Sequence, residues 1–458
     1  MKFVTINPTT EQTIAEYEIM SYGTIGEILE AAHVGFTSWK STSMDERKLL
    51  FRSLADVLRL RSDEFAKLMV TEMGKPIKQA IAEVEKCAWT CEVYAEKADE
   101  WLESENVTAD GKEHKVIFQP LGVILAVMPW NFPFWQVFRF AIPSIMVGNT
   151  AILKHSNNVP GCSLAIAEAF TQAGFPKGVF TSVLADHEQV GEILESDYVQ
   201  GVSLTGSTYA GSKIAETAGK NLKKVVLELG GSDPFIILED ADLDFVVKNA
   251  VFGRTQNNGQ SCIAAKRFIV HESIASDFSG LFAKALTNLK VGDPMDPDVD
   301  IGPMANVGEY NLIKEQLKDA IEQEGIILAG GEIPDKAGYF VEPTLVTNTN
   351  SNMKIVKEEV FGPVAPVITF SSDVEAIKLA NNTEFGLGGS IWGADEVRTR
   401  AIAAELECGS VFINSIVKSD PRMPFGGVKK SGMGRELSKY GLKEFVNVKA
   451  INIYSHQP

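Results

Sequence analysis

Cysteine is scarce in this sequence, and the few cysteines present do not form the pattern of a disulfide-stabilised or metal-binding scaffold. The 458 residues include five cysteines, which are widely scattered apart from Cys87 and Cys91. Their spacing matches neither a disulfide framework nor a metal site, so we expect no bound metal. Free thiols of this kind are typical of a reducing compartment, and we predict a cytoplasmic protein.

Long apolar runs and a surplus of basic residues are also missing, which argues against membrane and nucleic-acid partners. The longest apolar stretch, Gly122 to Met128, is far shorter than the roughly 20 residues that a membrane helix requires. The segment from Met1 to Pro8 has one basic residue and no apolar signal region, so secretion is not expected. The formal net charge of −17 is opposite in sign to a surface that binds nucleic acid.

The composition that remains is that of a globular protein with more than one core. Apolar residues make up 45% of the chain and charged residues 22%, as in ordinary folded proteins. At about one domain per roughly 150 residues, a chain of this length is expected to form two or three domains.

Short apolar segments that alternate with helical segments predict a parallel α/β architecture. A helical pattern covers Ile25 to about Trp101; strand-like runs then occur at 122–128, 150–153, 180–184 and 200–204, and a second alternating set follows Cys262. Parallel sheets that are covered on both faces bind ligands at the carboxyl ends of their strands. That rule groups six residues around one crevice: Trp130, Asn131, Lys154, Asn157, Gly206 and Ser207.

Two segments lack an obvious local partner and indicate contacts between subunits. The residues from 107 to 123 alternate in polarity around Asp110-Gly111, which predicts a hairpin. The final strand-like run, 446–454, has no mate nearby in the sequence. We expect both to contribute to a sheet shared between subunits of a homodimer or homotetramer.

Cys262 is the strongest candidate for a nucleophile. It follows Gln256-Asn257-Asn258-Gly259-Gln260-Ser261, a polar run that predicts an irregular loop instead of a core strand. A lone cysteine is more often inert core filler, but a cysteine on such a loop is a site candidate. Its thiolate is the most nucleophilic side chain available to a protein.

Glu228 and a glycine-rich turn supply two further candidate functions. Glu228 stands within an apolar strand, 225–229, and burial raises the pKa of a carboxyl group toward the range of a general base. The turn Gly206-Ser207-Thr208-Tyr209-Ala210-Gly211 opens a helix whose N-terminus is suited to a phosphate. The turn departs from the dinucleotide fingerprint, so an ordinary strand-to-helix turn is an equal alternative.

Six motifs identify a family resemblance that extends over essentially the whole chain. They are Pro-Trp-Asn-Phe-Pro at 129–133, Thr-Gly-Ser at 205–207, Glu-Leu-Gly-Gly at 228–231, Asn-Gly-Gln-Ser-Cys at 258–262, Glu-Glu-Val-Phe-Gly-Pro at 358–363 and Pro-Phe-Gly-Gly at 424–427. In this order they resemble the NAD(P)-dependent aldehyde dehydrogenases, and within them most closely the succinate-semialdehyde dehydrogenases.

The resemblance implies an α/β fold with two Rossmann-type parallel-sheet domains and a small β oligomerisation element. The cofactor-binding domain would comprise residues 1–105 and 122–231, and the catalytic domain residues 232–435. Residues 106–121 and 436–458 would form the oligomerisation element.

Residue roles follow from the same resemblance. Cys262 would attack the aldehyde, Asn131 would stabilise the oxyanion, and Glu228 would activate the water that opens the thioester. Residues implied for NADP or NAD are Trp130, Lys154, Asn157, Thr205, Gly206, Ser207, Leu229, Glu359 and Phe361. Asn157 stands where NAD-specific relatives typically have Glu, so we expect NADP to be tolerated and leave the preference open.

The substrate prediction depends on three residues. Arg139 is eight residues after Asn131 in an apolar helical segment, and similar semialdehyde dehydrogenases hold the distal carboxylate with an arginine there; a surface arginine is the alternative. A second arginine of those enzymes is Gln256 here, and Arg422 is a candidate replacement. We therefore expect oxidation of succinic semialdehyde, with lactaldehyde or glyceraldehyde as the alternative because Gln256 is able to bind hydroxyl groups.

Two rival functions remain. Acylating relatives pass the thioester to coenzyme A and generally lack the base, whereas Glu228 is present here. A non-enzymatic protein on the same fold is disfavoured because Cys262, Glu228, Asn131 and Glu359 are all intact.

Overall fold

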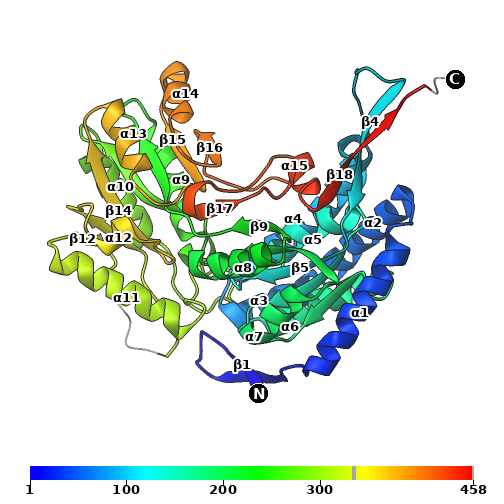
Figure 1. The fold of residues 1–458 in the computed structure, drawn as a ribbon. Coiled ribbons are helices and arrows are strands. Elements are labelled where there is room, and N and C mark those ends of the chain that lie inside the picture. Colours follow the sequence, from blue (N-terminus) through cyan, green and yellow to red (C-terminus); the bar gives the residue numbers. More distant parts are fainter. Residues whose placement is uncertain (333–336, 456–458) are drawn as a thin grey trace.

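Two sheets, each covered by helices, form the body of the protein, and a narrow β arm extends from it (Figure 1). The computed structural model describes residues 1–332 and 337–455. The predicted α/β class is confirmed, because strands and helices alternate and the long sheets are mainly parallel. Among the described residues, no helix combines the length and apolar character needed to cross a membrane.

The first sheet has the strand order β17-β9-β8-β5-β6-β7 and is parallel except for β17. Its strands are β5 (Val123–Met128), β6 (Thr150–His155), β7 (Phe180–Val183), β8 (Val199–Thr205), β9 (Lys224–Glu228) and β17 (Gly432–Met433). The central strands are short, apolar and buried, as expected for a sheet that is covered on both faces. The carboxyl ends of these strands carry most of the residues that the sequence grouped around one crevice.

The helices of this half confirm the helical pattern predicted from Ile25 to about Trp101. They are α1 (Tyr22–Trp39), α2 (Met44–Leu60), α3 (Ser62–Met73), α4 (Ile77–Trp101), α5 (Trp135–Met146), α6 (Pro160–Gln172), α7 (His187–Glu195) and α8 (Thr208–Lys220). Ser43 and Glu46 form a capping box at the start of α2, and Gly74 ends α3 in the left-handed region with φ of 76°. An N-terminal hairpin, β1 (Lys2–Ile6) and β2 (Thr13–Glu18), was not predicted.

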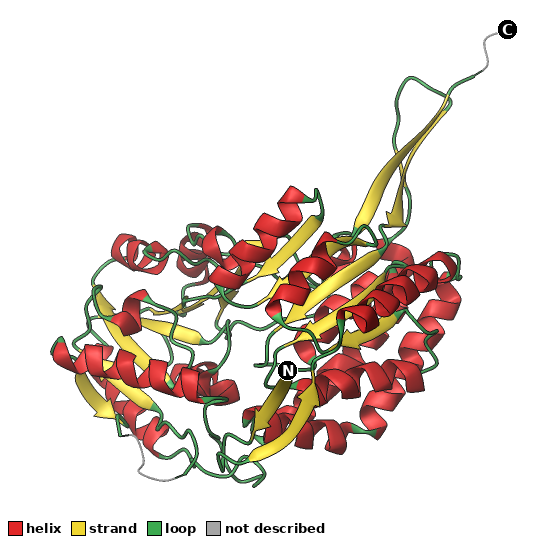
Figure 2. Ribbon diagram, turned by 60° about the horizontal axis from the view of Figure 1, so that its bottom comes forward, coloured by secondary structure: helices red, strands yellow, loops and turns green. Residues whose placement is uncertain are grey.

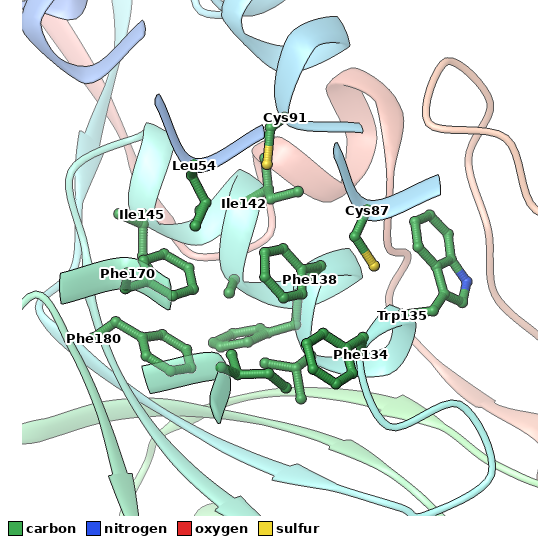
Figure 3. Close-up of a cluster of buried hydrophobic side chains, with 14 of the residues drawn as sticks. Leu54, Cys87, Cys91, Phe134, Trp135, Phe138, Ile142, Ile145, Phe170 and Phe180 are labelled. Atoms are coloured by element: carbon green, nitrogen blue, oxygen red, sulfur yellow. The ribbon is translucent and has the colours of Figure 1, made fainter. Parts of the chain in front are cut away.

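Helix α5 is buried on every side and forms the centre of this core (Figure 3). Phe138 stacks on Phe170, which in turn stacks on Phe180 with ring centroids 4.2 Å apart. Cys87 and Cys91 of α4 lie in the same apolar cluster, which accounts for their spacing of one helical turn. Each buried aromatic ring contributes about 1.5–3 kcal/mol of burial free energy, so α5 is held firmly in position.

The second sheet has the order β12-β13-β14-β11-β10-β15-β16 and is parallel except for β12. Its strands are β10 (Asp233–Ile237), β11 (Ala265–His271), β12 (Ile326–Ala329), β13 (Thr344–Thr347), β14 (Val364–Phe370), β15 (Gly388–Trp392) and β16 (Ser410–Ile413). The helices after β9 are α9 (Leu243–Thr255), α10 (Ala275–Thr287), α11 (Val307–Glu322), α12 (Lys354–Lys357), α13 (Asp373–Asn381), α14 (Glu396–Ala404) and α15 (Ser438–Leu442). Two short 3-10 turns are η1 (Gln256–Gly259) and η2 (Lys429–Ser431).

The arm is a three-stranded antiparallel sheet that projects from the body (Figure 1, Figure 2). The predicted hairpin is present as β3 (Glu105–Asn106) and β4 (Glu113–Pro120). The final strand β18 (Val446–Ile453) pairs with β4 from Val446↔Pro120 to Ile453↔Glu113. The last strand therefore has a mate within its own chain, more than 300 residues earlier, which its local sequence did not indicate.

The predicted domain boundary at 231/232 falls between β9 and β10, but the later boundaries need correction. Strand β17 lies within the predicted catalytic segment yet pairs with β9 of the first sheet, with Gly432 opposite Glu228. Helix α15, within the predicted oligomerisation segment, packs against α4 and α5. The reason is that the chain crosses back over the first sheet after completing the second, and reaches the arm only at β18.

Candidate active site

The loop that carries Cys262 is a strained turn between α9 and β11. Asn257 and Asn258 have φ of 56° and 59°, in the left-handed region that asparagine tolerates better than most residues. Gly259 follows with φ of 77°, and a Cβ there would lie 2.4 Å from the carbonyl carbon of Gly362. The polar sequence Asn-Asn-Gly is thus required by the turn, which supports the predicted irregular loop.

Hydrogen bonds connect this loop to Asn131 at the end of β5. The Asn257 side chain donates to the backbone oxygens of Asn131 at 2.7 Å and Gln260 at 2.9 Å. The Asn131 amide nitrogen donates to the same Gln260 oxygen at 3.2 Å, while its buried side-chain oxygen has no partner in the described part of the chain. The Asn131 amide is therefore held against the cysteine loop by buried contacts.

Two cavities meet at Cys262, which contributes to the wall of both. The first has a volume of about 430 Å³. The predicted residues that line it are Trp130, Asn131, Thr205, Gly206, Ser207, Leu229, Glu359 and Phe361. The structure therefore brings together the predicted nucleophile Cys262 and most of the residues expected to hold a cofactor.

The first cavity has the features that a dinucleotide requires. Ser207 caps the 13-residue helix α8 by accepting from the Ala210 amide at 3.2 Å, and the N-terminus of α8 opens at the cavity wall. A helix N-terminus favours an anionic phosphate through its free N–H groups and its dipole. Glu359 is oriented by Lys266, which donates to it at 2.7 Å, and by the Gly231 amide at 3.1 Å. Its carboxylate is therefore fixed as an acceptor for hydroxyl groups.

Lys154 and Asn157 lie at the carboxyl end of β6, outside the wall of the first cavity itself. The Lys154 ammonium donates to the Asn157 side-chain oxygen at 2.9 Å. Burial lowers the pKa of Lys154 to about 8. Neighbouring His155 is buried against the backbone oxygens of Met128 and Pro133, so it is not available to a ligand.

Glu228 ends β9 with only 2% of its surface exposed, and neither carboxyl oxygen has a hydrogen-bond partner within the described structure. Burial raises the pKa of this carboxyl group well above its usual range, although the Arg139 charge opposes the shift. Gly426 makes room for it, since a Cβ there would lie 2.7 Å from the Glu228 Oε1 atom. Glu228 stands directly before Leu229, which lines the first cavity, and does not itself form part of either wall.

The Cys262 thiol is partly exposed, and burial raises its pKa to about 11. The positive charges of Arg139 and Lys266 act in the opposite direction. Lys266 also donates to the Cys262 carbonyl oxygen at 2.8 Å, so one lysine orients both the cysteine loop and Glu359.

The second cavity, of about 310 Å³, lies on the other side of Cys262 and includes Arg139 and Gln256 in its wall. Arg139 is fully buried, forms an ion pair with Glu436, and lies over the Phe425 ring at 4.5 Å. Its guanidinium also donates to Thr205 Oγ1 at 3.3 Å. The expected surface-arginine alternative is therefore wrong, but the charge of Arg139 already has a carboxylate partner.

The suggestion that Arg422 replaces the arginine absent at position 256 needs correction. Its side chain is 62% exposed, forms an ion pair with Asp420 at 2.7 Å, and lies over the Trp89 ring. It does not belong to the wall of the second cavity. The local Asp-Pro-Arg turn pairs the two charges, which the sequence spacing alone did not show.

Several residues of the site carry no sequence motif. Lys86 and Ser419 line the second cavity, Gln136 lines both, and Glu309 lines the first. Arg254 donates to four backbone oxygens, those of Gly259, Ala265, Val360 and Gly362. The helical spacing of α4 is the sequence feature that indicates part of this site, because it places residues 78, 79, 82, 83 and 86, which line the second cavity, on one face of the helix.

Comparisons with known proteins agree with this geometry. The family model described as "Aldehyde dehydrogenase family" matches residues 1–451. A probable succinate-semialdehyde dehydrogenase [NADP(+)] of Synechocystis sp. is 49% identical over 451 residues, covering 98% of this chain and 99% of the relative. The succinate semialdehyde dehydrogenase [NAD(P)+] Sad of Escherichia coli (strain K12) is 46% identical over 449 residues, covering 98% and 97%.

Solved structures give the same result at the level of the fold. The crystal structure of succinic semialdehyde dehydrogenase from Streptococcus pyogenes in complex with NADP+ superposes with a TM-score of 0.97 at 39% identity, covering 99% of this chain and 100% of that one. Sequence, fold and site architecture thus agree, and the chain belongs to the aldehyde dehydrogenase family.

Proposed function

We propose that this chain oxidises succinic semialdehyde to succinate and uses NADP as the preferred hydride acceptor. The observation that carries the proposal is the position of Cys262 between two cavities. One has the helix N-terminus and oriented carboxylate that suit a dinucleotide, and the other has cationic side chains in its wall. The names of the Synechocystis sp. and Escherichia coli relatives support the same substrate and cofactor.

In the proposed reaction, the Cys262 thiol first gives its proton to water; the thiolate then attacks the aldehyde carbon, and the π electrons of the C=O bond move to oxygen to give a thiohemiacetal oxyanion. The second N–H of the Asn131 amide and the Cys262 backbone N–H donate to the oxyanion. NADP would supply the hydride acceptor when bound; the lining residues of the first cavity, with Lys154 and Asn157 at the end of β6, would hold it. When the oxyanion collapses, the C–H bond of the former aldehyde carbon breaks, its hydrogen leaves as hydride with both bonding electrons, and an acyl group remains on the Cys262 sulfur.

Glu228 then acts as the general base for hydrolysis. When ionised, it takes a proton from a water molecule, whose oxygen attacks the thioester carbon; the Cys262 thiol leaves and the carboxylate product forms. Its burial without a hydrogen-bond partner supports this role, because a raised pKa makes the carboxylate a stronger base. The presence of this base also favours hydrolysis over transfer to coenzyme A.

The preference for NADP over NAD is supported by the charges near β6. The Asn157 side chain is neutral and accepts a hydrogen bond from the Lys154 ammonium at the end of β6. Position 157 therefore has no carboxylate that would repel a 2′-phosphate. The partly desolvated ammonium is suited to pair with an added phosphate charge. NAD lacks that phosphate and would bind here more weakly.

Two further parts of the proposal concern the assembly and the compartment. A homodimer or homotetramer is supported by the projecting arm, whose outer strand β18 exposes Val448, Ile451 and Ile453. A reducing cytoplasm is supported by five free cysteines, one of them the proposed nucleophile.

Oxidation of lactaldehyde or glyceraldehyde is the second candidate function, because the Gln256 amide lines the second cavity.

A panel of aldehydes assayed with each cofactor tests the proposal. We expect kcat/KM for succinic semialdehyde to exceed that for uncharged butanal of equal chain length by about 10- to 100-fold, as one charge-assisted contact allows. We also expect a higher kcat/KM with NADP than with NAD. A preference for lactaldehyde over succinic semialdehyde would contradict the substrate assignment.

The role of Glu228 makes a separate prediction for Glu228→Gln. Because acylation does not require the base, the variant should release about one equivalent of NADPH per active site in a rapid burst. Steady-state turnover should then fall by about 100-fold or more, the usual scale of general base catalysis. Stopped-flow absorbance at the NADPH band measures both phases. Loss of the burst together with turnover would assign Glu228 to an earlier step.

A further inference from the structure

Residues 74–83, at the junction of α3 and α4, contact both loops that carry the proposed oxyanion donors. On one side they hold the cysteine loop. The Asn258 side chain donates to the Gly74 carbonyl oxygen at 2.8 Å, and the Asn257 backbone N–H donates to the Gln79 side-chain oxygen at 2.7 Å. The cysteine loop is therefore tied to this junction by two hydrogen bonds.

Glu83 of α4 holds the other loop, residues 129–134, which carries Asn131. One of its carboxylate oxygens accepts from the backbone N–H groups of Phe134 and Trp135 at 2.9 Å each. These N–H groups open α5, which has no cap from the side chain at its own N-cap position, so they have no partner within the helix. The dipole of α5 also favours a carboxylate at this end. Glu83 thereby fixes the point where the Asn131 loop joins α5.

Lys75 completes this arrangement. Its ammonium forms an ion pair with the second carboxylate oxygen of Glu83 and lies 3.8 Å from the centre of the Phe132 ring, next to Asn131. Only 1% of the Lys75 side chain and 3% of the Glu83 side chain are exposed. A buried ion pair is often no more stable than an apolar pair of similar volume, because its desolvation offsets its attraction. The groups that the pair orients account for it better than stability does.

We propose that Glu83, with Lys75 as its partner, is a positioning residue for the oxyanion site: it holds the Asn131 amide in register with the Cys262 loop. The inference rests on the proposed reaction, in which Asn131 stabilises the oxyanion. Donors of this kind act only when they are placed before the charge forms, and a displacement of about 1 Å can slow a reaction by about 100-fold. Glu83 lines the second cavity, but both of its oxygens already accept hydrogen bonds.

The test compares two double variants that both remove the ion pair. Lys75→Met/Glu83→Leu takes away the acceptor for the α5 amides, whereas Lys75→Met/Glu83→Gln keeps an oxygen that is able to accept from them. Neither leaves a buried charge without its partner, so both should fold. We expect the NADPH burst to be about 10- to 100-fold slower in the first variant and to stay within about threefold of the wild-type rate in the second.

Glu83→Asp is a further variant for use if the first double variant folds poorly. It keeps both charges of the pair but draws the carboxylate away from the α5 amides by one methylene group. We expect its burst to be about tenfold slower than that of the wild type. A burst at the wild-type rate in Glu83→Asp and in Lys75→Met/Glu83→Leu would overturn the positioning role.

Alkylation of Cys262 by iodoacetamide separates positioning from a general loss of structure. The reaction requires the thiolate but no oxyanion donor, because the thiolate attacks a saturated carbon. The contacts of Gly74 and Gln79 with the cysteine loop remain in every variant. The alkylation rate and Kd for NADP should therefore change by less than about threefold. If alkylation slows as much as the burst, Glu83 supports the fold around Cys262 and the inference is wrong.

An Asn131→Ala background shows whether the effect passes through Asn131. This substitution alone should slow the burst by about 100- to 1000-fold, the scale for loss of one oxyanion donor. Adding Lys75→Met/Glu83→Leu should then slow it by less than about threefold more, because the group that Glu83 positions is already absent. A full further loss in this background would overturn the inference and leave the proposed function intact.

The choice of aldehyde gives the last discrimination. Succinic semialdehyde and butanal form the same oxyanion, so Lys75→Met/Glu83→Leu should slow the burst by the same factor with both. A loss confined to succinic semialdehyde would mean that Glu83 acts on the distal end of the substrate, contrary to the inference. If Asn131→Ala alone leaves the burst unchanged, the proposed role of Asn131 fails, and the role of Glu83 fails with it.

Discussion

At the scale of single residues, the site contains buried polar side-chain atoms that lack hydrogen-bond partners among the described residues. Asn131 has an unpaired side-chain oxygen, and Glu228 has no hydrogen-bond partner for either oxygen among the described residues. An unsatisfied buried polar group costs about 1–3 kcal/mol, so each is a stability cost that only a function explains. The same burial that costs stability raises the pKa of Glu228 and suits it to act as a base.

The Cys262 thiol gives a prediction at this scale. Its pKa of about 11 means that the protonated thiol predominates throughout the neutral range. The thiolate fraction below the pKa increases tenfold per pH unit, so alkylation by iodoacetamide in the absence of cofactor should accelerate about tenfold per unit between pH 7 and 9. Residual activity after timed exposure measures the rate.

Cys408 provides an internal comparison for this experiment, because burial raises its pKa to about 12. Peptide mapping should therefore find Cys262 labelled first. A rate that is constant above pH 7 would mean that Cys262 is already a thiolate at neutrality, contrary to the burial argument.

At the scale of elements, the site depends on loops that are tied to one another across the junction of the two sheets. Arg254 at the end of α9 donates to the Gly259 and Ala265 carbonyls on the cysteine loop and strand. It also donates to the Val360 and Gly362 carbonyls, which flank Phe361 in the wall of the first cavity. One guanidinium thereby sets the position of the Cys262 loop relative to that wall.

Replacing Arg254 should therefore loosen both loops together. In Arg254→Met, four buried carbonyl groups lose a donor, and we expect the free energy of unfolding to fall by about 3 kcal/mol or more. KM for NADP should rise because Glu359 and Phe361 lose their support. Urea denaturation and cofactor titration measure the two effects.

Arg400→Met is the control, since Arg400 is exposed on α14 and, within the residues that the structure describes, forms an ion pair only with Glu396. It should change neither quantity by a measurable amount. If Arg254→Met loses stability but keeps its KM for NADP, the four contacts support the fold without positioning the cofactor loop.

At the scale of the whole molecule, the projecting arm has a structure that packing within the body does not account for. Among the described residues, none of its strands lines either cavity and the outer edge of β18 is unpaired, while apolar side chains are exposed on it. Unprotected edge strands are rare in isolated proteins because they pair with other chains. We therefore expect the arm to bind a second copy of the protein.

Charged substitutions on the arm should weaken that assembly. The double variant Ile451→Asp/Ile453→Asp places two carboxylates in the proposed interface, where their desolvation is unfavourable. Size-exclusion chromatography with light scattering should give a smaller mass than for the wild type. Val374→Asp, at an exposed position of α13, is the control and should keep the wild-type mass. An unchanged mass for the double variant would place the interface elsewhere.

The sequence by itself determined the α/β class, the helical segment before residue 101, the arm hairpin and the family, because these follow from local periodicity, turn residues and short motifs. It also singled out Cys262, Glu228 and most of the predicted residues that line the first cavity, because their motifs stand at the ends of predicted strands. Only the tertiary structure decided that β18 pairs with β4, that β17 returns to the first sheet, and that Arg139 is neutralised by Glu436. Such long-range pairings depend on the packed positions of distant segments, which no local pattern encodes.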